Sequence, residues 1–356
     1  MRKLFTLAAV ALTPLLSAWG QPIPQDRQQA GQPATIIFET DMGNDVDDAL
    51  ALDMLYKYAD LGTINLLAVM TNKNNRYSAE YIDIMNTWYG YPDLPLGIVR
   101  NGVDSGGDDN YAAKVCLLKD KKGRPLFRRS GRDLNALPDA HRLYRKLLAA
   151  QPDNSVTIVS VGFSTNLVRL LNSAADEYSQ LNGRDLVARK VQRLIMMAGG
   201  FDGSNRGEYN VIIDIPSAKT IFHEWPTPIV TSPWEVGTAI EYPAESIIND
   251  FGWLTAKSRK KRSEGEQRSP MVEAYKAYLP MPYDRPTWDL TAVLYAVEGP
   301  DWFSISRSGT IHVSDKGVTT FSSDTDSHRR YLIVTPAQAH RIRQHFINLV
   351  SQPTFK

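Results

Sequence analysis

The sequence predicts an α/β fold with a mostly parallel central sheet flanked by helices and a few antiparallel strands near the C-terminus. Two observations support this prediction. From residue 35 onward, short apolar runs alternate with amphipathic stretches of helical length, an order typical of parallel sheets covered by helices on both faces. Near the C-terminus, several short strand-like runs follow one another without intervening helices, which favours antiparallel pairing.

The elements follow in chain order. Apolar runs predict strands at residues 35–40, 64–70, 155–161, 194–198 and 228–231. Amphipathic stretches predict helices at residues 46–59, 77–89, 164–172 and 217–223. The later strand-like runs are residues 302–305, 310–313, 317–321 and 330–334. A final helix is expected with Thr335 as its N-cap and Pro336 at its first position.

Residues 1–20 have the pattern of a cleaved secretory signal peptide. A basic start precedes a short apolar run, and Ala18 and Gly20 are small residues of the kind that a signal peptidase reads. A membrane anchor would need about 20 apolar residues, and Pro14 interrupts this shorter run. We therefore expect the mature chain to be periplasmic or secreted, without a membrane anchor after cleavage.

The rest of the chain is expected to form one domain. Residues 21–33 are polar and rich in Pro and Gln, which predicts a disordered lead-in, and residues 34–356 follow as a single domain. The 40 Lys and Arg residues nearly balance the 39 Asp and Glu residues, so bulk charge gives no reason to expect binding to nucleic acid or membrane. Cys116 is the only cysteine, which excludes a disulfide within the chain.

An acidic cluster stands between the first predicted strand and the first predicted helix. Its members are Glu39, Asp41, Asp45, Asp47 and Asp48. In doubly wound sheets, ligands bind beyond the carboxyl ends of the strands. Carboxylates packed there repel one another unless a cation or bound hydroxyls compensate. Oxygen ligands without nearby Cys or His indicate a hard cation, calcium or magnesium.

Helix capping is the alternative interpretation of this cluster. Asp45 could be the N-cap of the helix, with Asp47 and Asp48 in its first turn. Capping does not explain Asp41, which precedes the helix by a full loop. An EF-hand starting at Asp41 would require Gly where Val46 stands.

The segment that contains Asp41, Asp47 and Asp48 resembles the signature of the inosine-uridine-preferring nucleoside hydrolases, Asp-Thr-Asp-Pro-Gly-x-Asp-Asp-Ala. Glu39 replaces the first Asp and two extra residues precede the Asp pair, departures that resemble a divergent branch of the superfamily. Further blocks are similar to the family in the same order: residues 67–71, 158–166 and 196–200, then Glu208-Tyr209-Asn210 and Trp288-Asp289. The resemblance covers most of the mature chain and implies a Rossmann-related, nucleoside hydrolase-like fold.

The resemblance implies a calcium site. Its ligands would be Asp41, Asp48 and Asp289, with the backbone carbonyl of Val161 as a fourth. Calcium can orient a water molecule and two ribose hydroxyls together. Asp41 would also act as the general base that takes the proton of the attacking water.

The resemblance also implies substrate-binding residues around this site: Asp47 for a ribose hydroxyl, Asn75 to support the loop on the metal side, Asn205, Glu208 and Asn210 for the hydroxyls and the 5′ end, and Trp288 in place of the family's His. Other interpretations remain for some residues. Asp289 could be the N-cap of a helix at residues 290–297, and Glu208 and Asn210 could be ordinary loop polarity. Asn166 is interpreted as a helix-start residue.

Trp288 raises a question about the departing base, because Trp has no titratable proton to replace that of His. The leaving group could be activated in another way, by Trp stacking or by Tyr283, Asp284 or Arg285. Alternatively, the substrate could carry a better leaving group than a normal base. In a third case, catalysis is lost and the site only binds sugars.

The sequence therefore predicts calcium-dependent hydrolysis of the N-glycosidic bond of a ribonucleoside or related riboside, through an oxocarbenium-like sugar. The alternatives are a non-catalytic calcium- or carbohydrate-binding protein on the same fold, and a hydrolase of a different glycoside. The expected partner is a small molecule. Family members are often dimers or tetramers, so a homo-oligomer is possible, but no surface stripe in the sequence identifies an interface.

Overall fold

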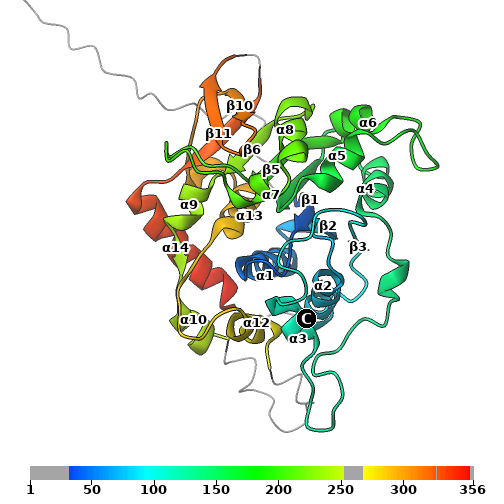
Figure 1. The fold of residues 1–356 in the computed structure, drawn as a ribbon, viewed down its shortest axis with the longest axis vertical. Coiled ribbons are helices and arrows are strands. Elements are labelled where there is room, and N and C mark those ends of the chain that lie inside the picture. Colours follow the sequence, from blue (N-terminus) through cyan, green and yellow to red (C-terminus); the bar gives the residue numbers. More distant parts are fainter. Residues whose placement is uncertain (1–31, 252–267, 326, 353–356) are drawn as a thin grey trace, which may run out of the picture.

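The computed structural model describes residues 32–251, 268–325 and 327–352 (Figure 1). The predicted signal peptide at residues 1–20 and nearly all of the predicted lead-in at residues 21–33 lie outside these ranges. Within them, no helix combines the length and the apolar character that a membrane span requires.

The described residues form a central sheet of ten strands, whose order along the main path is β11-β10-β12-β6-β5-β4-β1-β2-β3. The strands of the parallel part are β1 (Ala34–Thr40), β2 (Ile64–Thr71), β3 (Leu96–Gly97), β4 (Val156–Val161), β5 (Val191–Met197), β6 (Ile229–Ser232) and β12 (Arg329–Ile333). The antiparallel strands are β9 (Ser304–Ile305), β10 (Gly309–Val313) and β11 (Thr319–Ser323).

The predicted sheet is thus confirmed, with one correction to its last strand. The run at residues 330–334 was expected to be antiparallel like its neighbours in sequence. It forms β12, which pairs in parallel with β6 and antiparallel with β9 and β10. β12 therefore joins the parallel part of the sheet to the antiparallel edge.

Helices cover both faces of the sheet (Figure 1). The side chains of β1 alternate, so that Ile36 and Phe38 enter one apolar core and Ile37 enters the other. The first core is closed by α1 (Asp47–Asp60), α2 (Arg76–Trp88), α3 (Tyr111–Cys116), α12 (Pro270–Tyr278), α13 (Trp288–Glu298) and α14 (Pro336–Val350). The second is closed by α4 (Ala140–Ala149), α5 (Thr165–Leu171), α6 (Gly183–Lys190) and α8 (Ile215–Glu224).

Short elements complete the described fold: α7 (Tyr209–Ile213), α9 (Trp234–Thr238), α10 (Ala244–Asn249), the 3-10 turns at Leu134–Ala136 and Pro300–Trp302, and the strand pair β7 (Glu241–Tyr242) and β8 (Arg285–Pro286). The start of α14 confirms its predicted capping. Thr335 is the N-cap, its hydroxyl accepts a hydrogen bond from the backbone N–H of Gln338, and Pro336 follows at the first position.

Candidate active site

A cavity of about 500 Å³ opens at the carboxyl ends of the parallel strands. Asp41 follows β1, Val161 ends β4 and Met197 ends β5, and all three line it. Parallel strands place their carboxyl ends along one edge of the sheet, which explains why segments far apart in sequence meet here. Most of the predicted site residues also line the cavity: Asp41, Asp47, Asp48, Val161, Glu208, Asn210, Trp288 and Asp289.

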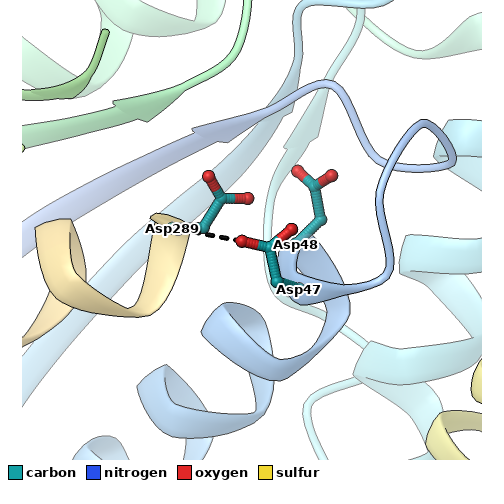
Figure 2. A group of neighbouring side chains, drawn as sticks. All are labelled: Asp47, Asp48 and Asp289. Atoms are coloured by element: carbon teal, nitrogen blue, oxygen red, sulfur yellow. Dashed lines mark hydrogen bonds between the residues drawn. The ribbon is translucent and has the colours of Figure 1, made fainter. Parts of the chain in front are cut away.

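Three carboxylates gather between the starts of two helices. Asp47 and Asp48 begin α1, Asp289 lies in the first turn of α13, and each offers an oxygen within 4.8 Å of the others (Figure 2). The Asp289 backbone N–H donates to Oδ2 of Asp47 at 3.0 Å. Because helix N-termini carry partial positive charge, both helices favour negative charge at this point.

The two predicted N-caps in this region, Asp45 and Asp289, are wrong. Val46, not Asp45, is the N-cap of α1, and no side chain caps that helix. Thr287 is the N-cap of α13, so that Asp289 is already helical. The first-turn positions expected for Asp47 and Asp48 are confirmed.

Asp41 lies on the same cavity wall but outside the group of three. Its Oδ2 accepts a hydrogen bond from the Asn44 amide. The adjacent Gly43 has φ +112°, a conformation that L side chains rarely adopt, and a Cβ there would lie 3.2 Å from Oδ1 of Asn110. This sharp turn redirects the chain after Asp41, so that Asp48 comes back beside the end of β1, where the Thr40 hydroxyl donates to its carboxylate.

Burial and mutual repulsion set the electrostatics of the cluster. Burial raises the pKa of Asp41 to about 6, an effect that the Asn44 hydrogen bond opposes. Burial also raises the pKa values of Asp47, Asp48 and Asp289 well above the usual range. Nearby carboxylates raise them further: Asp45 acts on Asp47, Asp41 on Asp48, and Asp47 on Asp289. Four buried carboxyl groups are the donor set that a hard divalent cation prefers.

Glu208 and Asn210 form the wall beyond β5. Glu208 is the N-cap of α7, and its carboxylate accepts backbone N–H groups of Asn210, at 2.8 Å, and Gly199, at 3.1 Å. Burial raises its pKa to about 7 in spite of these bonds. The Asn210 amide donates to the Met197 carbonyl at 3.0 Å. Both side chains are therefore fixed by the backbone while they line the cavity.

Trp288 and Tyr278 contribute an aromatic wall. The Trp288 indole N–H donates to the Trp234 carbonyl and to Oγ1 of Thr238, both at 3.0 Å. Gly237 makes this packing feasible, because a Cβ there would lie 2.3 Å from Cδ1 of Trp288. The indole thus presents its ring to the cavity while its N–H is used elsewhere. No histidine is among the described residues that line the cavity.

Two predicted residues do not line the cavity. Asn75 is the N-cap of α2, and its amide donates to the Gly107 carbonyl and to Asp108, so that it supports a loop beside the cavity and does not reach the cavity itself. Asn205 is exposed, with φ +52°. The structure therefore does not bring these two side chains to the predicted substrate site.

Asn166 lies at a helix start, as interpreted from the sequence, but its side chain also makes contacts that the sequence did not predict. It is the second residue of α5, but its amide donates to Oε1 of Glu39 and to the Thr71 carbonyl, both at 2.9 Å. Tyr144 donates to the other Glu39 oxygen at 2.7 Å. Burial nevertheless raises the pKa of Glu39 to about 7. Asn166 thus ties α5 to the strands directly beneath the cavity.

Sequence reasoning missed Asn72 and Lys73. Asn72 is buried beside Asp41 and Gly162, and neither polar atom of its side chain makes a hydrogen bond of normal geometry with the described residues. Lys73 is buried in the cavity wall and donates to Oδ1 of Asn44 at 2.5 Å. The available signal was position, because both residues directly follow β2, where a parallel sheet binds its ligands.

Comparisons with known proteins identify the family and the fold of this chain. The family model described as inosine-uridine preferring nucleoside hydrolase matches residues 36–344. The pyrimidine-specific ribonucleoside hydrolase RihA of Salmonella paratyphi C is 26% identical over 233 residues, which are 61% of this chain and 66% of the relative. The match thus spans slightly less than two thirds of that relative.

Two solved structures share the fold. The plant nucleoside hydrolase PpNRh1 has a TM-score of 0.65 at 17% identity, covering 90% of this chain and 98% of its own. The type III effector protein XopQ, solved in complex with adenosine diphosphate ribose, has a TM-score of 0.60 at 15% identity, covering 92% of this chain and 95% of its own.

Proposed function

The chain belongs to the inosine-uridine preferring nucleoside hydrolase family, and we propose that it hydrolyses the N-glycosidic bond of a ribonucleoside or related riboside in a calcium-dependent reaction. The observation that carries this proposal is the meeting of Asp47, Asp48 and Asp289, from opposite ends of the chain, in one buried acidic cavity that Asp41 also lines.

Asp48 and Asp289 are the proposed cation ligands, together with Asp41 and the Val161 carbonyl. Calcium held there would supply the positive charge that orients a water molecule and two sugar hydroxyls. The carboxylates fit such a cation, because burial and mutual repulsion raise their pKa values, and a bound cation would offset both effects. Asp47 accepts a hydrogen bond from a ribose hydroxyl, while Glu208 and Asn210 bind the rest of the sugar.

Asp41 is the proposed general base. The water oxygen forms a bond to the anomeric carbon while the bond from that carbon to the base nitrogen breaks, and its electron pair leaves with the nitrogen. Asp41 takes the proton that the water loses. In the metal-free chain, burial raises the pKa of Asp41 to about 6, which makes its carboxylate a stronger base than an exposed one. The remaining negative charge of the cavity favours the oxocarbenium-like sugar.

Release of free ribose tests the proposal directly. The panel consists of purine and pyrimidine ribonucleosides, with adenosine diphosphate ribose added because XopQ was solved in complex with it. For adenosine diphosphate ribose the released adenine is measured, because its ribose stays attached to the diphosphate. Each substrate is incubated with the mature protein in excess calcium and, separately, after dialysis against a chelator. We expect ribose from at least one nucleoside in calcium only. Turnover that persists without metal contradicts the calcium requirement. Calcium-dependent binding of nucleoside without ribose release favours the non-catalytic alternative.

We further propose that the protein acts outside the cytoplasm. The support is the basic, then apolar, then small-residue order of residues 1–20. A substrate that reaches this compartment would be an extracellular nucleoside or riboside.

A further inference from the structure

The cavity wall next to Trp288 carries a phenol held in a polar network. Tyr278 ends α12 and lines the cavity. Its hydroxyl accepts a hydrogen bond from the Arg285 guanidinium at 2.8 Å and donates one to Oδ2 of Asp45 at 3.2 Å. Arg285 in turn donates to both oxygens of Asp45, at 2.9 Å through Nε and more closely through its terminal nitrogen.

Arg285 joins this phenol to the aromatic wall. Its guanidinium carbon lies 5.0 Å from the ring centroid of Tyr278 and 5.0 Å from that of Trp288. Trp288 directly precedes Asp289 of the carboxylate group. The network therefore holds the Tyr278 hydroxyl on the same cavity wall as Trp288, which is next in sequence to the proposed cation ligand Asp289.

The other proton-bearing aromatic and cationic groups that line the described cavity are held differently. The Tyr111 hydroxyl contacts the Gly43 N–H and the Met42 sulfur, 3.2 and 3.0 Å away, and the Tyr209 hydroxyl donates to Ser105 at 2.8 Å. The Lys73 ammonium donates to Asn44 beside Asp41, and the Lys114 ammonium pairs with Asp109 at 3.0 Å. Among these described groups, neither tyrosine hydroxyl accepts a hydrogen bond from a cationic side chain. The Tyr278 hydroxyl does, from Arg285, so that the charge of its phenolate would be stabilised.

We propose that Tyr278 is the catalytic residue that protonates the departing base, with Arg285 and Asp45 as positioning residues. This inference rests on the proposed nucleoside hydrolysis and replaces the missing His with a tyrosine–arginine–aspartate network. It concerns the leaving-group side of the cavity, whereas Asp41 acts on the water side.

The proposed step is balanced. In the free chain the Tyr278 O–H donates to Asp45, and in the proposed step it turns from Asp45 to the base. As the electron pair of the glycosidic bond passes to the base nitrogen, the Tyr278 O–H bond breaks and its proton moves to an acceptor atom of the base. The Arg285 guanidinium stabilises the negative charge of the phenolate through the hydrogen bond that it already donates to the Tyr278 oxygen. The phenolate regains a proton from water after the base has left, and the proton that Asp41 took returns to solvent. Burial and the Asp45 carboxylate raise the pKa of the Tyr278 phenol, whereas the Arg285 charge lowers it. The phenol is therefore protonated at neutral pH, and Arg285 is the neighbour that favours loss of its proton.

The test compares two leaving groups. The purified mature protein and its Tyr278→Phe variant are assayed in calcium with inosine or uridine, and with 4-nitrophenyl riboside, whose nitrophenolate leaves without a proton. We expect Tyr278→Phe to lower kcat on the nucleoside by about 100-fold or more. On the nitrophenyl riboside, we expect Tyr278→Phe to lower kcat by less than about threefold, because the nitrophenolate needs no proton and a general acid contributes little to its departure. KM should change little on both substrates.

Matched variants separate catalysis from structure. Tyr283→Phe is the control, because the Tyr283 hydroxyl donates to the Tyr275 carbonyl and does not line the cavity, so both activities should persist. Arg285→Met should show the same selective loss on nucleosides, and Arg285→Lys should recover part of it. Thermal unfolding of each variant checks the fold.

Three outcomes would overturn the inference. Tyr278→Phe could retain the full nucleoside rate, or it could lose both activities equally, which indicates a structural role. Arg285→Met could lose neither activity. An unmodified protein that hydrolyses neither kind of substrate would instead refute the proposed function, and the inference with it.

Discussion

The carboxylate cluster predicts that calcium stabilises the protein more strongly near neutral pH than in mild acid. In the metal-free folded chain, burial raises the pKa of Asp41 from 3.8 to about 6. Between about pH 4 and pH 6 the folded chain therefore binds more protons than the unfolded chain, and its stability falls as the pH rises through this window. Above the window, the difference for Asp41 alone is worth about 3 kcal/mol.

Calcium should recover this loss, because it neutralises the same carboxylates once they are ionised. In mild acid, the ion must first displace their protons. Glu39, Glu208 and Asp53 are also buried, with pKa values raised to about 7, 7 and 6. They lower stability with rising pH in the same direction, but they are not proposed ligands. A comparison with and without calcium at each pH therefore isolates the cluster.

The assay is thermal unfolding followed by circular dichroism. Protein freed of metal is compared with calcium-saturated protein at about pH 5 and about pH 7. For a chain of this size, a difference of about 3 kcal/mol corresponds to about 4 °C in Tm. We expect the calcium-induced rise in Tm to be larger by that amount at the higher pH. In Asp48→Asn, the metal-free protein should be more stable near neutral pH, and the calcium response should be lost. An equal calcium effect at both pH values would refute the reasoning.

Four further predictions concern the site and the leader. Asp41→Asn should lower kcat by about 100- to 10,000-fold and weaken calcium binding by calorimetry, and a full rate would remove Asp41 as the base. Trp288→His, placed in the Tyr278→Phe background, should recover part of the nucleosidase rate, and no gain would show that position 288 does not serve the leaving group. Gly237→Ala should displace Trp288, lower stability by about 1–3 kcal/mol and reduce kcat/KM, and an unchanged Tm would contradict the packing. Mass spectrometry of the exported protein should find a chain that begins at Gln21, and an uncleaved chain in the cytoplasm would contradict the signal peptide.

Local patterns predicted most of the sheet and one side of the cavity. Hydrophobic periodicity located the strands, and the rule that ligands bind at their carboxyl ends located Asp41 and Asp48. The same rule also applies to Asn72, which directly follows β2 and is buried. Asn75, which resembles the Asn of the family at this point, lies three residues further on, where its side chain caps the start of α2.

Contacts between distant segments could not be predicted from such patterns. The parallel pairing of β12 depends on β6, about a hundred residues earlier in the sequence, and nothing in the short run itself distinguishes it from its antiparallel neighbours. Asp289 looked like a helix cap from its local sequence, but Thr287 takes that position. Its contact with Asp47 is made by its backbone, which the residue type does not reveal.

Asp45 shows how the two kinds of information combine. Its place before a helix suggested a cap, yet its carboxylate binds Arg285, 240 residues away in sequence. The pair is half-buried, with side-chain exposures of 25% for Asp45 and 21% for Arg285. A half-buried charge loses part of its hydration, and a partner of opposite charge compensates for that loss. The loop after β1 is two residues longer than the family signature, and Asp45 lies in it. In the mechanism proposed above, this one loop would act on both sides of the reaction, because Asp41 is the proposed base for the water and Asp45 binds Tyr278, the proposed acid for the leaving group.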